Sequence, residues 1–105
     1  MPQFSVYENI NQSSKEAMPY LLDVQSDLLK HLSTRVVVPL CPVSALGRKS
    51  ISTLSPEFDI NGDSYTLLTP QLAGVELSDI GPLTADLSDH RFEIINALDF
   101  LFTGF

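Results

Sequence analysis

The alternation of hydrophobic and polar residues predicts short β-strands in the first part of the chain. Phe4 and Val6 alternate with more polar neighbours, which is the period-two pattern of a half-buried strand. Residues 18–24 and 35–40 are the next expected strands, and the second contains three consecutive valines, whose β-branched side chains suit a pleated surface. Because proline lacks a backbone N–H, Pro39 indicates an edge or an end of that strand.

The middle of the chain contains the clearest local signal, a turn sequence between two strand-like runs. Asn61 and Gly62 both tolerate positive φ, as a two-residue hairpin turn requires. The runs 57–60 and 65–69 lie on either side of this turn. The segment therefore predicts a β-hairpin.

Other segments have weaker patterns. Residues 8–17 are polar and predict an exposed loop, and residues 41–54 predict a long loop because they lack a clear period. A further short strand is expected within residues 71–77, with the Gly81-Pro82 pair interrupting the chain after it.

The last part of the chain changes to a helical period. Ser88 is a favourable N-cap, and Leu87 and Phe92 have the spacing of a hydrophobic staple. Apolar residues then recur three and four positions apart, at Ile94, Ile95, Leu98, Leu101 and Phe102. These signals predict a helix over residues 89–102, closed by Gly104. Short strands followed by one terminal helix predict a mainly β fold, an antiparallel sheet or partly open barrel with a helix packed on it.

Length and charge restrict the function. The 105 residues fit a single domain, residues 1–105, and the net charge of −7 disfavours a general nucleic-acid-binding role, because such a chain is repelled by phosphates. One cysteine, Cys41, forms no internal disulfide, and no apolar run approaches the ~20 residues of a membrane span. We therefore expect a cytoplasmic protein without a membrane partner.

The charge is unevenly distributed. Residues 28–56 contain no acid and carry +4, from Lys30, Arg35, Arg48 and Lys49, whereas both flanking segments are acidic. Two interpretations remain open: these side chains are individually solvated, or they form a patch for an acidic partner segment.

The sequence contains no convincing catalytic or metal-binding cluster. His31 and His90 lie far apart and have no neighbour at metal-ligand spacing, Cys41 has no evident partner, and the glycines are too scattered for a nucleotide-binding loop. We expect no catalytic residue, no metal and no cofactor. The closing residues, with Phe100, Phe102 and Phe105 close to the end, instead favour an apolar contact surface.

Several segments, in order along nearly the whole chain, resemble the CcdB family of toxins. They are FSVYEN at 4–9, LLDVQSDLL at 21–29, RVVVPL at 35–40, INGDSYTLLT at 60–69, ADLS at 85–88 and INALDFLFTGF at 95–105. The resemblance implies a homodimer with a small SH3-like, partly open barrel and a C-terminal helix. It also implies a non-enzymatic gyrase poison, which binds the dimerisation region of the DNA gyrase A subunit and traps the cleaved-DNA complex. A cognate CcdA-like antitoxin neutralises such a toxin, and the complex of the two represses the shared operon, so that DNA is contacted only through that complex.

The resemblance also implies the contact residues. The family ends in Trp-Gly-Ile, which falls here on Thr103, Gly104 and Phe105, so the glycine matches and the tryptophan does not. The other implied gyrase contacts are Ser26, Leu28, Asn96, Asp99 and Phe102. The implied antitoxin contacts lie around residues 45–50 and include Ala45, Leu46, Arg48 and Lys49.

Two alternatives remain open at the level of sequence. MazF-like endoribonuclease toxins share the fold, and fold does not determine function. An RNA-cleaving site requires cationic groups facing phosphate, for which Arg35 and Arg48 are the candidates if they lie close together. The second alternative is a regulatory adaptor that binds antitoxin but has lost toxicity, and its basis is Thr103 in place of tryptophan.

Overall fold

The structure, a computed structural model, describes residues 2–46 and 52–104. Within these residues one antiparallel sheet contains seven strands: β1 (Ser5–Asn9), β2 (Tyr20–Asp23), β3 (Thr34–Pro42), β4 (Glu57–Ile60), β5 (Asp63–Leu67), β6 (Ala73–Glu76) and β7 (Ile80–Asp86). The α-helices are α1 (Val43–Leu46) and α2 (Arg91–Thr103), and the 3₁₀ turns are η1 (Asp27–Leu29), η2 (Thr69–Gln71), η3 (Leu77–Asp79) and η4 (Ser88–His90). The mainly β fold with one long C-terminal helix is confirmed.

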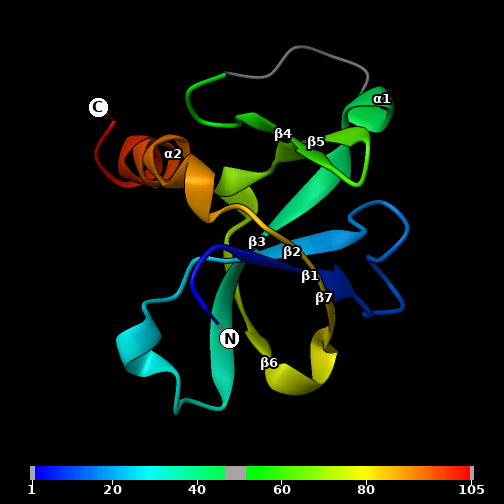
Figure 1. Cartoon of the computed structure of the whole chain (residues 1–105), viewed down its shortest axis with the longest axis vertical. Coiled ribbons are helices and arrows are strands. Elements are labelled where there is room, and N and C mark those ends of the chain that lie inside the picture. The colour runs from blue at the N-terminus through cyan, green and yellow to red at the C-terminus, as the bar shows by residue number, and fades with distance from the viewer. Residues whose placement is uncertain (1, 47–51, 105) are drawn as a thin grey trace.

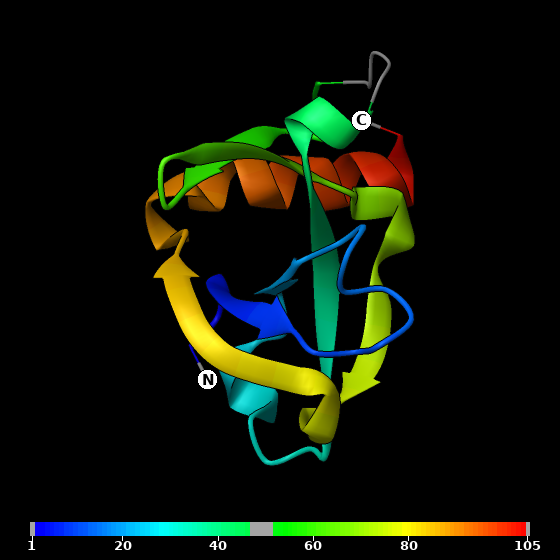
Figure 2. The ribbon, with the colours of Figure 1, turned by 90° about the vertical axis from the view of Figure 1, so that its right-hand side faces the viewer.

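Strand β3 organises the sheet. It pairs with β2 along one side, and along the other side with β6 through its first half and with β5 through its second. The main strand order is β4-β5-β3-β2-β1-β7, and the sheet curls into a half-barrel (Figure 1). Helix α2 lies along the β4–β5 end, and Figure 2 shows it crossing above the curled strands.

The core forms where the sheet and α2 meet. Val6, Leu22, Val38 and Leu40 are completely buried on the central strands, and Ile94 of α2 packs into the same cluster. Burial of side chains of this size contributes roughly 1.5–3 kcal/mol each, so this cluster holds α2 on the sheet.

The hairpin is confirmed. Strands β4 and β5 pair with Ile60 opposite Asp63, and the two turn residues Asn61 and Gly62 have φ of 53° and 91°. Positive φ at both positions matches the twist of the flanking strands.

The predicted half-buried first strand is wrong in its boundaries and its burial. Strand β1 begins at Ser5, and Phe4 precedes it with a φ of 70°. Val6 and Tyr7 are both buried although they point to opposite faces. Side chains on both faces of β1 are covered by the protein, so the half-buried pattern does not apply to this strand.

The position of Pro39 also differs from the prediction. It lies inside β3, paired with Leu21 of β2, and its carbonyl accepts the N–H of Leu68 on the other side. On that side, β3 pairs with β6 up to Val37 and with β5 from Leu40 onward. Pro39 lies between the two pairings, so its missing N–H removes no hydrogen bond from either ladder.

One predicted loop and one predicted interruption of the chain contain regular structure. The segment 41–54 begins with the end of β3 and the short helix α1, and residues 47–51 lie outside the described residues. Gly81 and Pro82 do not interrupt the chain, because they lie within β7. This strand is at the edge of the sheet, where proline is tolerated.

The start of the terminal helix differs in detail. Ser88 does not cap the helix through its side chain; its own N–H donates to Asp86 Oδ1 at 2.8 Å, and η4 precedes α2, which begins at Arg91. The staple is wrong as well, because Leu87 is buried whereas Phe92 is 79% exposed. With η4 inserted, Phe92 falls in the first turn of α2 on the side facing water.

Candidate protein-binding surfaces

Helix α2 presents an exposed stripe. Ile94 and Ala97 are its buried side, while Phe92, Asn96, Asp99 and Phe102 are exposed. The spacing of these four residues places them along one side of the helix, with the two polar residues between the two exposed phenylalanine rings. We call these four residues the α2 stripe. Phe102 is 69% exposed, so the core does not absorb it, and the sequence prediction of an apolar contact surface at this helix end is consistent with its position.

The end of α2 is closed by Gly104. Its φ is 79°, and its N–H donates to the Phe100 carbonyl at 2.9 Å, which confirms the predicted left-handed cap. The hydroxyl of Thr103 donates to the Asp99 carbonyl at 2.7 Å, so this side chain bonds back onto its own helix. Phe105 lies outside the described residues.

The second group of predicted contacts lies on η1. Ser26 precedes this turn, and its hydroxyl accepts the N–H of Leu28 at 3.2 Å. Leu28 is 87% exposed, and no residue of η1 is buried. The turn therefore presents an apolar side chain to water without any apolar anchor of its own.

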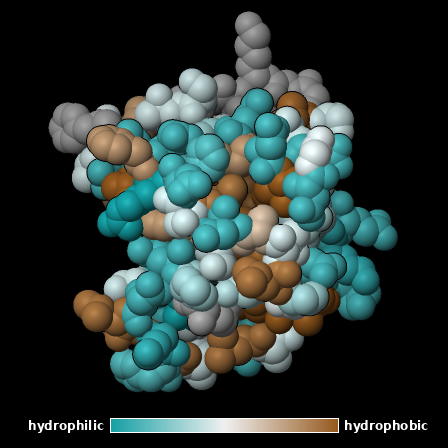
Figure 3. Space-filling model, in the orientation of Figure 1, coloured by the Kyte–Doolittle hydropathy of each residue, from teal (hydrophilic) through white to brown (hydrophobic). Residues whose placement is uncertain are grey.

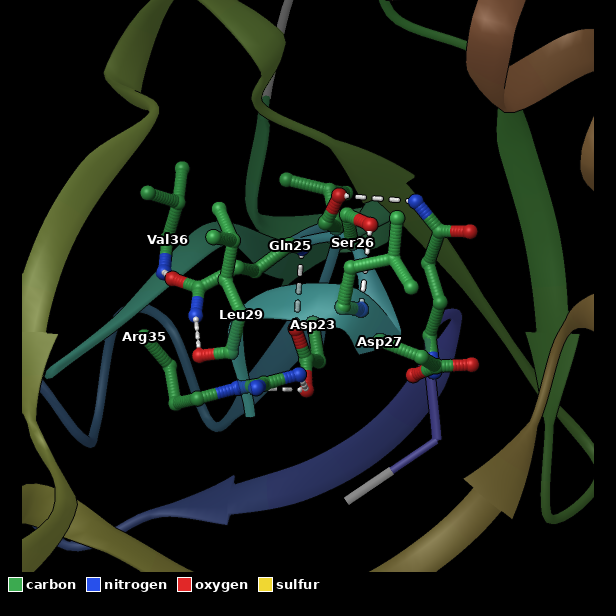
Figure 4. Close-up of polar contacts among 10 residues, drawn as sticks. Asp23, Gln25, Ser26, Asp27, Leu29, Arg35 and Val36 are labelled. Carbon is green, nitrogen blue, oxygen red and sulfur yellow. Dashed lines mark hydrogen bonds and ion pairs between the residues drawn. The ribbon is translucent and has the colours of Figure 1, made fainter. Parts of the chain in front are cut away.

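A buried polar network lies beneath η1 (Figure 4). Asp23, at the end of β2, is completely buried, and its Oδ2 accepts hydrogen bonds from Nε and Nη2 of Arg35. Asp23 Oδ1 accepts the N–H of Gln25 at 3.0 Å. The side-chain amide of Gln25 then donates to the Leu29 carbonyl and accepts the N–H of Val36, both at 3.0 Å.

The charge state of this network is set by competing effects. Burial raises the pKa of the Asp23 carboxyl above its ordinary value, whereas the hydrogen bonds from Arg35 and Gln25 and the positive charge of Arg35 act to lower it. Mutation of only one member of this buried ion pair lowers the free energy of unfolding, because the remaining charged group stays buried without a partner.

The two groups of predicted contacts do not meet within one chain. Turn η1 and the C-terminal part of α2 lie toward opposite ends of the long axis in both ribbon views (Figures 1 and 2). In the space-filling view, hydrophobic atoms reach the surface in the region of η1 and again in the region of α2 (Figure 3). Ser26 and Leu28 are therefore separated from Asn96, Asp99 and Phe102.

The cationic segment does not form one patch among the described residues. Arg35 is only 1% exposed and is bonded to Asp23, and Lys30 follows η1, toward the opposite end of the molecule from α1. Of the predicted antitoxin contacts, Ala45 is exposed on α1, Leu46 is the last residue of that helix, and Arg48 and Lys49 lie outside the described residues. Arg35 is therefore neither individually solvated nor part of a surface patch, so both interpretations left open by the sequence are wrong for this residue.

The titratable and nucleophilic residues form no evident reaction centre in the described parts of the chain. No group of three His, Cys, Asp or Glu residues has metal-binding geometry there. His90 contacts Glu93 at 3.1 Å and packs on the ring of Phe58. Cys41 is buried, and burial raises the pKa of its thiol, which lowers its reactivity.

Sequence reasoning missed the Asp23–Arg35 pair and the exposure of Phe92. A signal for the pair was present, because an acid near the end of one apolar strand and a base near the start of the next fall at the same end of an antiparallel pair. Phe92 could not be placed, because η4 shifts the start of the helix.

The fold and these surfaces define a small half-barrel protein with exposed apolar side chains on η1 and α2. The sequence matches the CcdB protein family over residues 3–104, and the chain belongs to this family. No helix among the described residues is long and apolar enough to cross a membrane.

Solved toxin structures share the fold at low sequence identity. The Mycobacterium tuberculosis toxin MazF-mt6 superposes with a TM-score of 0.74 at 13% identity, covering 93% of this chain and 95% of that one. A mycobacterial endoribonuclease in complex with its cognate antitoxin also gives 0.74, at 16% identity, covering 96% of this chain and 93% of that one. Family membership and fold together support a toxin of a toxin–antitoxin system.

Proposed function

We propose that this protein is a gyrase poison, which acts by binding the dimerisation region of the DNA gyrase A subunit and trapping its complex with cleaved DNA. The observation that carries the proposal is the α2 stripe, where Phe92 and Phe102 stand exposed beside Asn96 and Asp99. Aromatic side chains flanked by polar groups are typical of the residues that dominate protein interfaces. Such a toxin makes and breaks no bond; it shifts gyrase toward the state that it binds best.

The geometry adds a requirement to this proposal. The η1 residues and the α2 stripe lie at opposite ends of one chain, so one chain alone does not bring them to a single contact surface. A two-fold homodimer presents each end twice and is suited to a partner that is itself two-fold symmetric. We therefore include homodimerisation in the proposed mechanism, and sedimentation at tens of micromolar tests it: a monomer would contradict the mechanism.

Thr103 determines how the proposed contact differs from that of the family. Where the family has tryptophan, this chain has Thr103, which offers no aromatic surface. Its hydroxyl donates to the Asp99 carbonyl, so the side chain is bonded to its own helix. Phe102 is adjacent and exposed, and it supplies aromatic area at the same helix end. We propose that Phe102 is the aromatic anchor in this chain.

The endoribonuclease alternative rests on the fold shared with the MazF structures. Its candidate cationic pair was Arg35 and Arg48, and Arg35 is buried against Asp23. A guanidinium in that position does not face a phosphate group in solvent. The burial of Arg35 removes one of the two candidate residues for RNA cleavage, which supports the gyrase proposal, and the lack of enzymatic activity is part of that proposal.

The proposed second partner is a cognate antitoxin. Its expected contacts are Ala45, Leu46, Arg48 and Lys49, and their cationic members suit an acidic segment. A complex of toxin and antitoxin is the proposed repressor of the shared operon.

A gyrase cleavage assay tests the proposal. Purified protein is incubated with gyrase, ATP and supercoiled plasmid, and we expect linear DNA after denaturation of the trapped complex. Absence of linear DNA at concentrations well above micromolar would contradict gyrase poisoning. Degradation of RNA by the same preparation would establish the alternative, and antitoxin binding without either activity would identify an adaptor that has lost toxicity.

A further inference from the structure

Turn η1 is exposed and yet structurally defined. It has no buried residue, so burial of apolar surface does not hold it in place. A free three-residue segment would sample many conformations, and the backbone entropy lost on ordering it must be offset by other interactions. In this structure those interactions are hydrogen bonds: the Gln3 N–H donates to Asp27 Oδ1 at 2.8 Å in an exposed position, and the buried Gln25 forms the others described next.

Gln25 connects both ends of η1 to the sheet. Its backbone N–H donates to the carboxylate of Asp23 just before the turn, and its side-chain amide donates to the Leu29 carbonyl at the end of the turn. The same amide accepts the N–H of Val36 in β3, so the turn is fixed to the edge of a core strand. Gln25 itself is only 6% exposed, so its side-chain bonds, drawn in Figure 4, are partly shielded from competing water.

We propose that Gln25, supported by the buried Asp23–Arg35 pair, is the positioning residue that fixes η1 so that Leu28 is presented to the partner protein. This inference rests on the proposed function, because η1 is assigned to the gyrase surface there. Gln25 does not contact the partner; it acts through the conformation of the turn. Leu28 is the contact residue, since it is 87% exposed and carries the apolar surface of the turn.

The chain offers a matched control for this role. Asn9 is another buried amide, 7% exposed, and its side chain donates to Ser14 Oγ at 3.0 Å and to the Met18 carbonyl at 2.8 Å. It fixes the loop of residues 10–19 in the same way as Gln25 fixes η1. Substitution of either amide side chain removes hydrogen bonds of similar length, but only Gln25 lies beneath η1.

The test compares Gln25→Met, Asn9→Met and Leu28→Ala for binding to the dimerisation fragment of gyrase A. We expect Gln25→Met and Leu28→Ala each to weaken binding about tenfold, and the double variant to lose much less than the product of the two, because both act through the same contact. Asn9→Met should lower the melting temperature by a similar amount while binding stays within about twofold of wild type. Amide hydrogen exchange at Leu28 and Leu29 should become at least about tenfold faster only in Gln25→Met.

The outcomes separate this inference from the proposed function. If the wild-type chain binds gyrase but Gln25→Met leaves binding or the exchange at Leu28 and Leu29 unchanged, the inference is overturned alone. It is also overturned if the two losses multiply, or if Asn9→Met weakens binding as much as Gln25→Met. If the wild-type chain binds no gyrase fragment, the proposed function fails and the partner assigned to η1 fails with it.

Discussion

At the α2 end of the molecule, exposed residues stand on a helix whose other side packs into the core, whereas at the η1 end they stand on a three-residue turn with no buried side chain. The first is fixed by Ile94 and Ala97. The second is fixed by hydrogen bonds that Gln25 donates to the buried Asp23 and to the Leu29 carbonyl, together with one that the Gln3 N–H donates to Asp27. A contact surface can thus be made rigid either by apolar packing or by shielded polar bonds. The two mechanisms predict different responses to mutation.

The largest expected effect is at the buried ion pair of the η1 end. Arg35→Met leaves the Asp23 carboxyl buried without its guanidinium partner, which costs about 3–5 kcal/mol of unfolding free energy. Urea denaturation measures this loss. The matched variant that also carries Asp23→Leu removes both charges and should recover part of the stability. A single variant as stable as wild type would show that the pair does not hold this end.

The next effect is at the apolar anchor of the α2 end. Ile94 is completely buried, so Ile94→Ala should cost about 2–4 kcal/mol through lost burial and the cavity left behind. The neighbouring Ile95 is only partly buried, and Ile95→Ala serves as the control with a distinctly smaller loss in the same denaturation experiment. Equal losses would contradict the assignment of Ile94 as the anchor.

A smaller effect is expected at the end of α2. A Cβ added to Gly104 would meet no atom within 4 Å, so the cost of Gly104→Ala arises from its φ of 79° alone. We expect a loss of about 1 kcal/mol, or a decrease in melting temperature of about 5 °C. Gly74 provides the control, because a Cβ there also meets open space and no positive φ is required. If Gly74→Ala lowers the melting temperature as much, the cap is not the cause.

The smallest effect on stability is expected at Phe102. Its ring is largely exposed, so Phe102→Ser should change the unfolding free energy by no more than about 0.5 kcal/mol. The same variant should weaken gyrase binding by at least about tenfold, because an aromatic anchor is lost. Calorimetric titration with the gyrase fragment measures the binding. Phe92→Ser, at the other end of the α2 stripe, is compared in the same titration. The variant with the larger loss of affinity shows which end of the stripe lies nearer the centre of the contact.

The parts of this fold that were predictable are those fixed by local sequence. The Asn61-Gly62 turn and the Gly104 cap depend on backbone conformations that few residues adopt, and both were predicted correctly. Strand β7 and the burial of both faces of β1 depend on pairing between distant segments, which local periodicity does not report. Arg35 was predicted on the surface for the same reason: its burial depends on Asp23 in another strand.

The candidate site was predictable in part. Phe102 and Leu28 are exposed, as a contact residue has to be, and the gyrase contacts that the family resemblance implies stay predictions. Their separation at opposite ends of the chain was not predictable, because it follows from the three-dimensional arrangement of η1 and α2.

The most direct test of the central claim is removal of the chain end from Phe102 to Phe105, which includes the exposed residue proposed as the aromatic anchor, measured by gyrase binding and by DNA cleavage. These residues lie beyond the buried positions of α2, so the truncated chain should keep its circular-dichroism spectrum and its affinity for the antitoxin. We predict that it no longer binds the gyrase A fragment and produces no linear DNA. A truncated, folded chain that still poisons gyrase would contradict the account, and a truncated chain that does not fold would show that this end belongs to the core.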